Sequence, residues 1–278
     1  MRFRNVSIVV ATFAIVAGAM SSVASAAPSG KVYLALGDSL AASFQPNGDV
    51  RHGYAEQVFQ LEQEGIPDLR LVKLACPGER TNTIDRPRRV CPYPAGSQLD
   101  QAVSVLESRD VAFVTLQIGS NDVFRCFRFG RAVFDQGCVD DLLPKLQDRL
   151  TSIVQTLQAA GPGVPIVGAT YYDPLLAAWN VPGIDHDAVV AIQDVWQSFD
   201  DALEQTYAGL GVPVADMEDA FSTTDFGTIV HLRRFGDVPL NVARVCQWTY
   251  ACSPRGFDPH PNTIGYARMT EAWVAAIP

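Results

Sequence analysis

The segment KVYLALGDSL, residues 31–40, places a short apolar run directly before a turn. An apolar run of this length without polar alternation is typical of a strand that is buried on both faces. Gly37 allows a tight turn, and Asp38 can accept hydrogen bonds from nearby backbone amides. The segment therefore predicts a buried strand over 31–36, followed by a turn that presents Ser39.

Further apolar runs of the same kind alternate with stretches of helical spacing. Strands are predicted at 69–74, 111–118, 164–169 and 212–215, and helices at 54–64, 139–157, 189–203 and 263–276. Strand alternating with helix predicts parallel βαβ units with right-handed crossovers. We therefore expect one α/β domain over residues 27–278, a three-layer α/β/α sandwich with about five parallel strands. Two long segments, 123–137 and 222–259, are expected to be irregular loops, which in compact domains tend to be functional.

The first 26 residues have the features of a secretory signal peptide. Arg2 and Arg4 precede an apolar run over 6–20, and Ala24-Ser25-Ala26 forms a small-x-small cleavage site. The apolar run is short for a bilayer span of about 20 residues, which favours cleavage over a membrane anchor. We expect a secreted chain that starts at Ala27 and has no stable membrane insertion.

The charge of the chain excludes one class of partner. The formal net charge is −9 at pH 7, and no cluster of basic residues is present to neutralise phosphates. We therefore expect no binding of nucleic acid. An acidic surface suits solubility outside the cell, and we expect the protein to be a monomer.

All six cysteines lie beyond the predicted signal peptide, and an even number in an exported chain predicts disulfides. They form three close sequential couples in Pro-, Gly- or polar-rich stretches, and we expect these couples to be bonded: Cys76–Cys91, Cys126–Cys138 and Cys246–Cys252. A metal site is not expected, because the chain has no CxxC and no histidine beside a couple.

Two later blocks offer hydrogen-bond donors that would complement a reactive Ser39. Gly78 follows the second predicted strand and can expose its backbone N–H, and Asn121 follows the third and offers a side-chain amide. The carboxyl ends of parallel strands meet at one edge of a sheet. Together with the Ser39 N–H, these groups would form an oxyanion hole, which stabilises a tetrahedral intermediate by several kcal/mol.

A serine hydroxyl also needs a base within hydrogen-bond reach. His260 is the best candidate, because it lies just before the last predicted helix in a segment that follows a long loop. His52, His186 and His231 lie in polar or loop-like stretches and are interpreted as surface or structural residues.

In combination, these four blocks resemble the SGNH (GDSL) hydrolase family. The resemblance extends from residue 31 to the final helix, and it implies a flavodoxin-like α/β/α sandwich without a metal or organic cofactor. It maps the family pattern onto Ser39 as nucleophile, His260 as base, and Gly78 and Asn121 as oxyanion donors. With the export signal and six cysteines, the chain is most similar to a secreted bacterial branch of lipases and esterases.

One position departs from the family pattern. The family commonly has an aspartate three residues before the histidine, but here that position is Phe257, and Asp258 lies two residues before His260. Either the Asp258 carboxylate accepts the Nδ1 proton of His260, or the backbone carbonyl of Phe257 does so. Both acceptors hold the required tautomer, but only the carboxylate adds full charge stabilisation.

The resemblance implies a small-molecule or lipid ester as substrate. We expect a lipase or esterase acting on acyl esters; the alternatives are a carbohydrate O-acetyl esterase and a non-catalytic extracellular binding module. Phe124, Phe127, Phe129 and Trp179 are candidates for the lining of an acyl pocket, although aromatic residues also pack beneath stapled loops.

Overall fold

The computed structural model describes residues 30–278, so the predicted signal peptide lies outside the described residues. Five parallel strands form a central sheet in the order β2-β1-β3-β6-β7. Their bounds are β1 Val32–Gly37, β2 Arg70–Lys73, β3 Val111–Gln117, β6 Ile166–Ala169 and β7 Val214–Ala215. Five parallel strands were expected, and the fold class is confirmed. Strand β1 lies inside the sheet, between β2 and β3.

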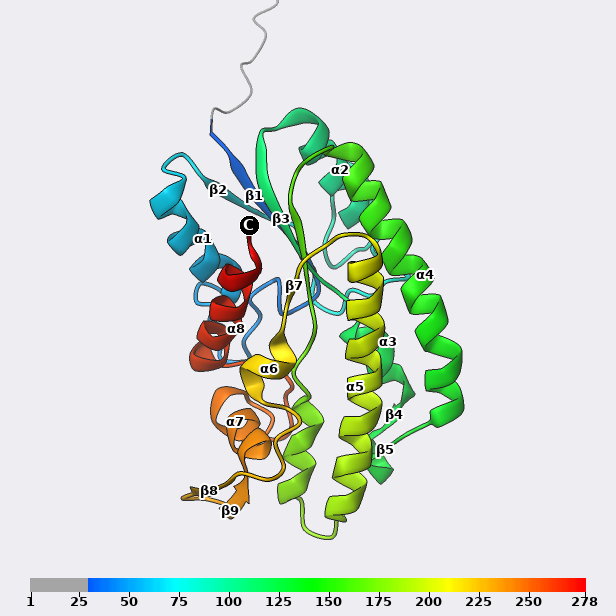
Figure 1. The fold of residues 1–278 in the computed structure, drawn as a ribbon, viewed down its shortest axis with the longest axis vertical. Coiled ribbons are helices and arrows are strands. Elements are labelled where there is room, and N and C mark those ends of the chain that lie inside the picture. The colour runs from blue at the N-terminus through cyan, green and yellow to red at the C-terminus, as the bar shows by residue number, and fades with distance from the viewer. Residues whose placement is uncertain (1–29) are drawn as a thin grey trace, which may run out of the picture.

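Helices cover both faces of the sheet (Figure 1). Helices α1 and α8 pack together on one face, and α2, α4 and α5 pack in succession on the other. The helices are α1 Tyr54–Gly65, α2 Gln98–Ser108, α3 Ser120–Val123, α4 Gln136–Ala160, α5 His186–Gly209, α6 Met217–Phe221, α7 Leu240–Trp248 and α8 Thr263–Ala276. Three short 3-10 helices are η1 Phe124–Cys126, η2 Phe129–Arg131 and η3 Pro174–Asn180.

The apolar character of the strands is explained by this double covering. Every residue of β1 is buried, and β3 is buried at all positions except Ala112. Covering on both faces leaves no side for polar residues, which is the pattern that the sequence shows. The helices are amphipathic, and α4 and α5 turn their apolar faces toward the sheet and toward each other.

The two segments expected to be irregular are partly ordered, which corrects that prediction. Residues 123–137 contain a small hairpin of β4 Phe127–Arg128 and β5 Val133–Phe134, and residues 222–259 contain β8 Ile229–Leu232, β9 Gly236–Pro239 and α7. Strands of two residues, as in the first hairpin, or four, as in the second, are too short to produce a clear alternation in sequence. Both hairpins lie beyond the carboxyl ends of the sheet strands, at the lower end of Figure 1.

Helix α2 was not predicted, although the sequence carried a signal for it. Ser97 accepts a hydrogen bond from Asp100 N, and the Asp100 side chain accepts one from Ser97 N, forming a capping box. A serine followed three residues later by an acidic residue is a helix-start pattern. The eleven residues of this helix also have an amphipathic pattern, with Gln98, Ala102 and Leu106 buried, so both signals for it were present in the sequence.

A bilayer-spanning helix is absent from residues 30–278, since none combines the necessary length with sufficient apolar character. The three disulfides join Cys76 to Cys91, Cys126 to Cys138 and Cys246 to Cys252. These are the three couples that their positions in sequence favoured.

Candidate active site

Ser39 lies in a turn at the carboxyl end of β1, and two features fix that turn. Gly37 has φ +129°, and a Cβ there would lie 1.9 Å from the carbonyl oxygen of Gln117 in β3. The side chain of Gln98 accepts a hydrogen bond from Gly37 N (2.7 Å) and donates one to Gly37 O (3.0 Å). A glycine is therefore required before Asp38, and a buried amide from α2 holds its backbone.

Asp38 is buried directly beside Ser39 and connects the turns that follow β1, β3 and β6. Its carboxylate accepts hydrogen bonds from Leu40 N (2.9 Å), Ser120 Oγ (3.0 Å) and Tyr171 OH (2.8 Å). The expected bond to a nearby backbone amide is thus confirmed. Burial raises the pKa of Asp38 to about 6, against the lowering effect of these three donors.

His260 faces Ser39, with Nε2 of the imidazole 2.9 Å from the Ser39 Oγ. The ring packs against Phe44 at a centroid distance of 4.5 Å. Its backbone is also held, because Tyr172 OH donates to Pro259 O and Tyr250 N donates to His260 O. The histidine is therefore oriented by groups from several elements before any substrate binds.

The second ring nitrogen of His260 contacts Asp258. Nδ1 lies 2.6 Å from Asp258 Oδ1, and the same oxygen accepts a hydrogen bond from His260 N at 3.0 Å. Within residues 30–278, His260 makes no hydrogen bond to the Phe257 carbonyl. The geometry is that of a Ser-His-Asp arrangement, in spite of the shortened spacing in the sequence.

Burial lowers the pKa of His260 below its ordinary value of 6.5, while the hydrogen bond and the charge of Asp258 act in the opposite direction. The imidazole is therefore predominantly neutral at neutral pH, with an unprotonated nitrogen available to Ser39. A neutral imidazole in contact with a hydroxyl is the state that general-base catalysis requires.

The candidate oxyanion donors lie on neighbouring loops. Asn121 Nδ2 donates to Glu79 O at 3.0 Å, which leaves its second N–H free for a ligand. The backbone N–H groups of Ser39 and Gly78 make no hydrogen bond to any other residue that the structure describes. Gly78 has φ +73° and is exposed, so a glycine is favoured at this position.

A cavity of about 80 Å³ brings together Ser39, Asn121 and His260. Phe124, Tyr171, Tyr172, Pro174 and Trp196 form most of its apolar wall. Gly78 does not line this cavity but lies next to Glu79, whose carbonyl holds the Asn121 side chain. The sequence prediction thus places three of the four block residues around one cavity and the fourth on the adjoining loop.

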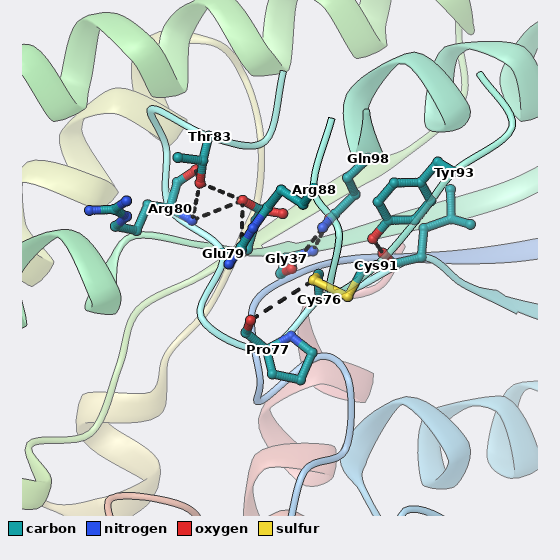
Figure 2. The surroundings of a disulfide bond; sticks show 11 residues. Gly37, Cys76, Pro77, Glu79, Arg80, Thr83, Arg88, Cys91, Tyr93 and Gln98 are labelled. Atoms are coloured by element: carbon teal, nitrogen blue, oxygen red, sulfur yellow. Dashed lines mark hydrogen bonds and ion pairs between the residues drawn. A yellow bond between two sulfur atoms is a disulfide. The ribbon is translucent and has the colours of Figure 1, made fainter. Parts of the chain in front are cut away.

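The loop that carries Gly78 is held by a buried network around the Cys76–Cys91 disulfide (Figure 2). Glu79 is almost fully buried and forms an ion pair with Arg88 (3.2 Å), and it also accepts a hydrogen bond from Thr83. Because Arg88 and Cys91 come from the same segment, the disulfide and the ion pair restrain one loop together.

Removal of this disulfide is expected to destabilise the protein. Cys76 and Cys91 are 15 residues apart, and a loop of this size corresponds to about 3 kcal/mol of unfolding free energy, or a melting temperature lower by roughly 6 to 12 °C. Thermal denaturation of a Cys76→Ala/Cys91→Ala variant measures this. The matched control is Cys246→Ala/Cys252→Ala, whose separation of 6 corresponds to about 2 kcal/mol. A melting curve equal to that of the wild type contradicts the stabilising role.

The four aromatic residues proposed for an acyl pocket separate into three groups. Phe124 lines the cavity at Ser39, and Phe127 and Phe129 line a larger neighbouring cavity of about 330 Å³. Trp179 lines neither of these cavities and stacks on His186 with ring centroids 3.7 Å apart, so for this residue the packing alternative holds.

The remaining histidines lie away from the cavity at Ser39. His52 pairs with Asp49 and His231 pairs with Asp237, and both of these histidines are exposed. His186 packs on Trp179.

Sequence reasoning missed Gln98 and Tyr171, because their partners lie 61 and 133 residues away in the chain. Groups of three or more histidine, cysteine or acidic side chains arranged for a metal ion are absent from the described part of the chain.

A family model described as the GDSL-like lipase/acylhydrolase family matches residues 35–268. The chain belongs to this family. The match spans all four blocks and most of the α/β sandwich, and it makes this GDSL hydrolase an ester-hydrolysing enzyme.

Solved structures of the same fold agree with the family assignment. The extracellular lipase from Streptomyces rimosus superposes with a TM-score of 0.58 at 17% identity, covering 88% of this GDSL hydrolase and 99% of that chain. Phospholipase A1 from Streptomyces albidoflavus gives a TM-score of 0.56 at 17% identity, covering 89% and 100%. At this identity the likeness establishes the fold alone. A search of curated proteins finds no match.

Proposed function

We propose that this GDSL hydrolase is a secreted serine esterase or lipase that cleaves acyl esters through a covalent Ser39 intermediate. The observation that carries the proposal is the contact of 2.9 Å between His260 Nε2 and Ser39 Oγ, with Asp258 at the other ring nitrogen. The three disulfides and the signal-like N-terminus support secretion.

In the proposed mechanism, His260 accepts the Ser39 proton as Oγ attacks the ester carbonyl carbon. The negative charge that forms on the carbonyl oxygen is stabilised by the Ser39 N–H, the Gly78 N–H and Asn121. The protonated His260 then transfers its proton to the departing alcohol, which leaves an acyl-enzyme. Water attacks the acyl-enzyme with His260 again as base, and the proton returns to Ser39.

Asp258 supports this cycle by charge and by orientation. It accepts the Nδ1 proton, which directs the free electron pair of Nε2 toward Ser39, and it stabilises the imidazolium that forms in each step. No step of the cycle calls for a metal or an organic cofactor.

A carbohydrate O-acetyl esterase is the second candidate, and the size of the inner cavity favours it. The space of about 80 Å³ at Ser39 suits a short acyl group. The adjoining apolar cavity of about 330 Å³ favours longer acyl groups instead. Rates with nitrophenyl esters of increasing chain length discriminate the two: preference for the acetate ester, together with activity on acetylated xylan, would contradict the assignment as a lipase.

A fluorophosphonate probe tests whether the site is catalytic at all. The wild type is expected to become labelled covalently, and the Ser39→Ala variant is not. A Ser43→Ala variant is a control for a neighbouring buried serine and should be labelled as the wild type, provided that circular dichroism shows it folded. Absence of labelling in the folded wild type would instead favour the non-catalytic binding module.

The pH dependence of kcat/KM is expected to have an acid limb with a midpoint below 6.5. Protonation of His260 removes the base, and burial lowers the pKa of this histidine, so activity is lost only as the pH falls through that lowered value. Because the pKa of Asp38 is about 6, titration of the histidine ring by NMR should accompany the kinetics. A midpoint above 6.5 for both the ring and the rate would contradict the prediction.

A further inference from the structure

The cavity of about 330 Å³ next to the candidate active site has the properties of a ligand site, and no role has yet been derived for it. Its volume falls in the range of about 300 to 1,000 Å³ that is typical of pockets for small molecules. The wall is mostly apolar and comes from four separate stretches, represented by Phe127, Leu175, Phe235 and Phe257. This composition suits an alkyl chain.

The cavity lies directly beside the one that contains Ser39. Pro174 lines the inner cavity and Leu175 the outer one, and Phe124 of the inner cavity stacks on Phe129 of the outer one with centroids 6.4 Å apart. Both hairpins beyond the sheet lie at this end of the molecule (Figure 1). A ligand held by its chain in the outer cavity is therefore close to Ser39.

Exposed apolar side chains mark the rim of this cavity. Phe129, Val181 and Phe257 line it and are 59%, 49% and 42% exposed. Phe129 and Phe257 lie close together, with ring centroids 5.9 Å apart. Exposed apolar patches on a soluble protein commonly mark a binding site, because their burial by a partner removes apolar surface from water.

Arg234 is the one charged residue among the lining residues, all of which belong to the described chain. Its guanidinium is fixed in place: Nη1 donates to Cys252 O at 2.7 Å, and the group lies 4.8 Å from the centroid of the Phe235 ring. The Cys246–Cys252 disulfide restrains the residue that supplies this carbonyl. Since a guanidinium has five N–H donors, several remain for an external anion.

No acidic side chain of residues 30–278 forms an ion pair with Arg234. The acidic residues near the lining segments contact other groups: Asp185 accepts a hydrogen bond from Asp187 N, Asp237 pairs with His231, and Asp258 contacts His260. In a chain with a net charge of −9, an exposed arginine held in the lining of an apolar cavity therefore favours a ligand with negative charge.

We propose that this outer cavity binds the alkyl chain of an anionic amphiphile, whose charged head contacts Arg234. The chain lies among Phe127, Leu175 and Phe257, and the head remains at the mouth. As a statement about substrate this rests on the proposed function, because an ester of such a molecule would be positioned for attack by Ser39. The binding site itself does not depend on hydrolysis.

Binding is tested with the Ser39→Ala variant, which excludes turnover, and with the fluorescent anionic probe dansylaminoundecanoic acid. The probe is expected to gain fluorescence on binding and to be displaced by decanoate about tenfold more effectively than by decyltrimethylammonium or decanol. Arg234→Gln should weaken probe binding about tenfold and remove the preference for decanoate. Arg233→Gln is the matched control, since Arg233 is exposed and adjacent but does not line the cavity.

A second variant avoids any effect on the arginine itself. Val181→Asp places a negative charge at the rim, at a half-exposed position that tolerates a polar side chain, and should weaken the probe while leaving the melting temperature within a few degrees. Absence of binding, equal displacement by the three decyl compounds, or wild-type affinity in Arg234→Gln would each overturn the proposal. Failure of fluorophosphonate labelling with probe binding intact would overturn the serine mechanism alone.

Discussion

A His260→Ala variant is expected to lose about six orders of magnitude in kcat on a nitrophenyl ester. Ser39 then has no base, because Nε2 of His260 is the basic atom in contact with its hydroxyl at 2.9 Å. In serine hydrolases the nucleophile and its base act as a unit, so loss of the base costs about as much as loss of the whole unit. Steady-state kinetics and loss of fluorophosphonate labelling measure the effect.

The matched control for this variant is His231→Ala. His231 also contacts an aspartate, Asp237, at 2.8 Å, but the pair is exposed and lies apart from the cavity at Ser39. Its replacement should leave kcat and KM at wild-type values. A His260→Ala enzyme that is folded by circular dichroism and retains more than about one part in a thousand of the wild-type kcat would contradict the role of His260 as base.

The Asp258→Asn variant is expected to lose about four orders of magnitude in kcat while remaining folded. An amide at this position removes the negative charge that stabilises the imidazolium, and it can present N–H instead of oxygen to Nδ1, which favours the wrong tautomer. Asp258 is partly exposed, with a side chain 30% accessible, so its replacement places no unpaired group in the core. KM is expected to change little, because the loss arises in the chemical steps.

This variant also decides between the two acceptors that the sequence leaves open. If the Phe257 carbonyl served as the acceptor, Asp258→Asn would lower kcat by less than about tenfold. Asp237→Asn is the matched control and should have no effect, because it removes an equivalent carboxylate from the exposed His231. The NMR titration of His260 gives an independent readout: loss of Asp258 should lower the pKa of the ring further, since the carboxylate raises it.

The sheet and the three disulfide couples could be predicted because their signals are local. Each strand appears as a short apolar run, and each disulfide joins cysteines at most 15 residues apart. Short elements gave no such signal, as β4, β5, β8 and β9 show. Helix α2 had local signals, a capping box at Ser97 and Asp100 and an amphipathic pattern, and was missed in spite of them.

By itself the sequence determined the parallel α/β layers, the positions of Ser39 and Asn121 after strands, and that of His260 before the last helix, because apolar period and turn chemistry depend on neighbouring residues. Only the tertiary structure decided which acceptor faces His260, that Gln98 and Tyr171 hold the turn that carries Ser39, and that Trp179 packs away from the cavities. It also decided that Arg234 is exposed and lines an apolar cavity. The physical reason is that side-chain direction and contacts between distant segments depend on strand register and layer packing, which no local pattern encodes.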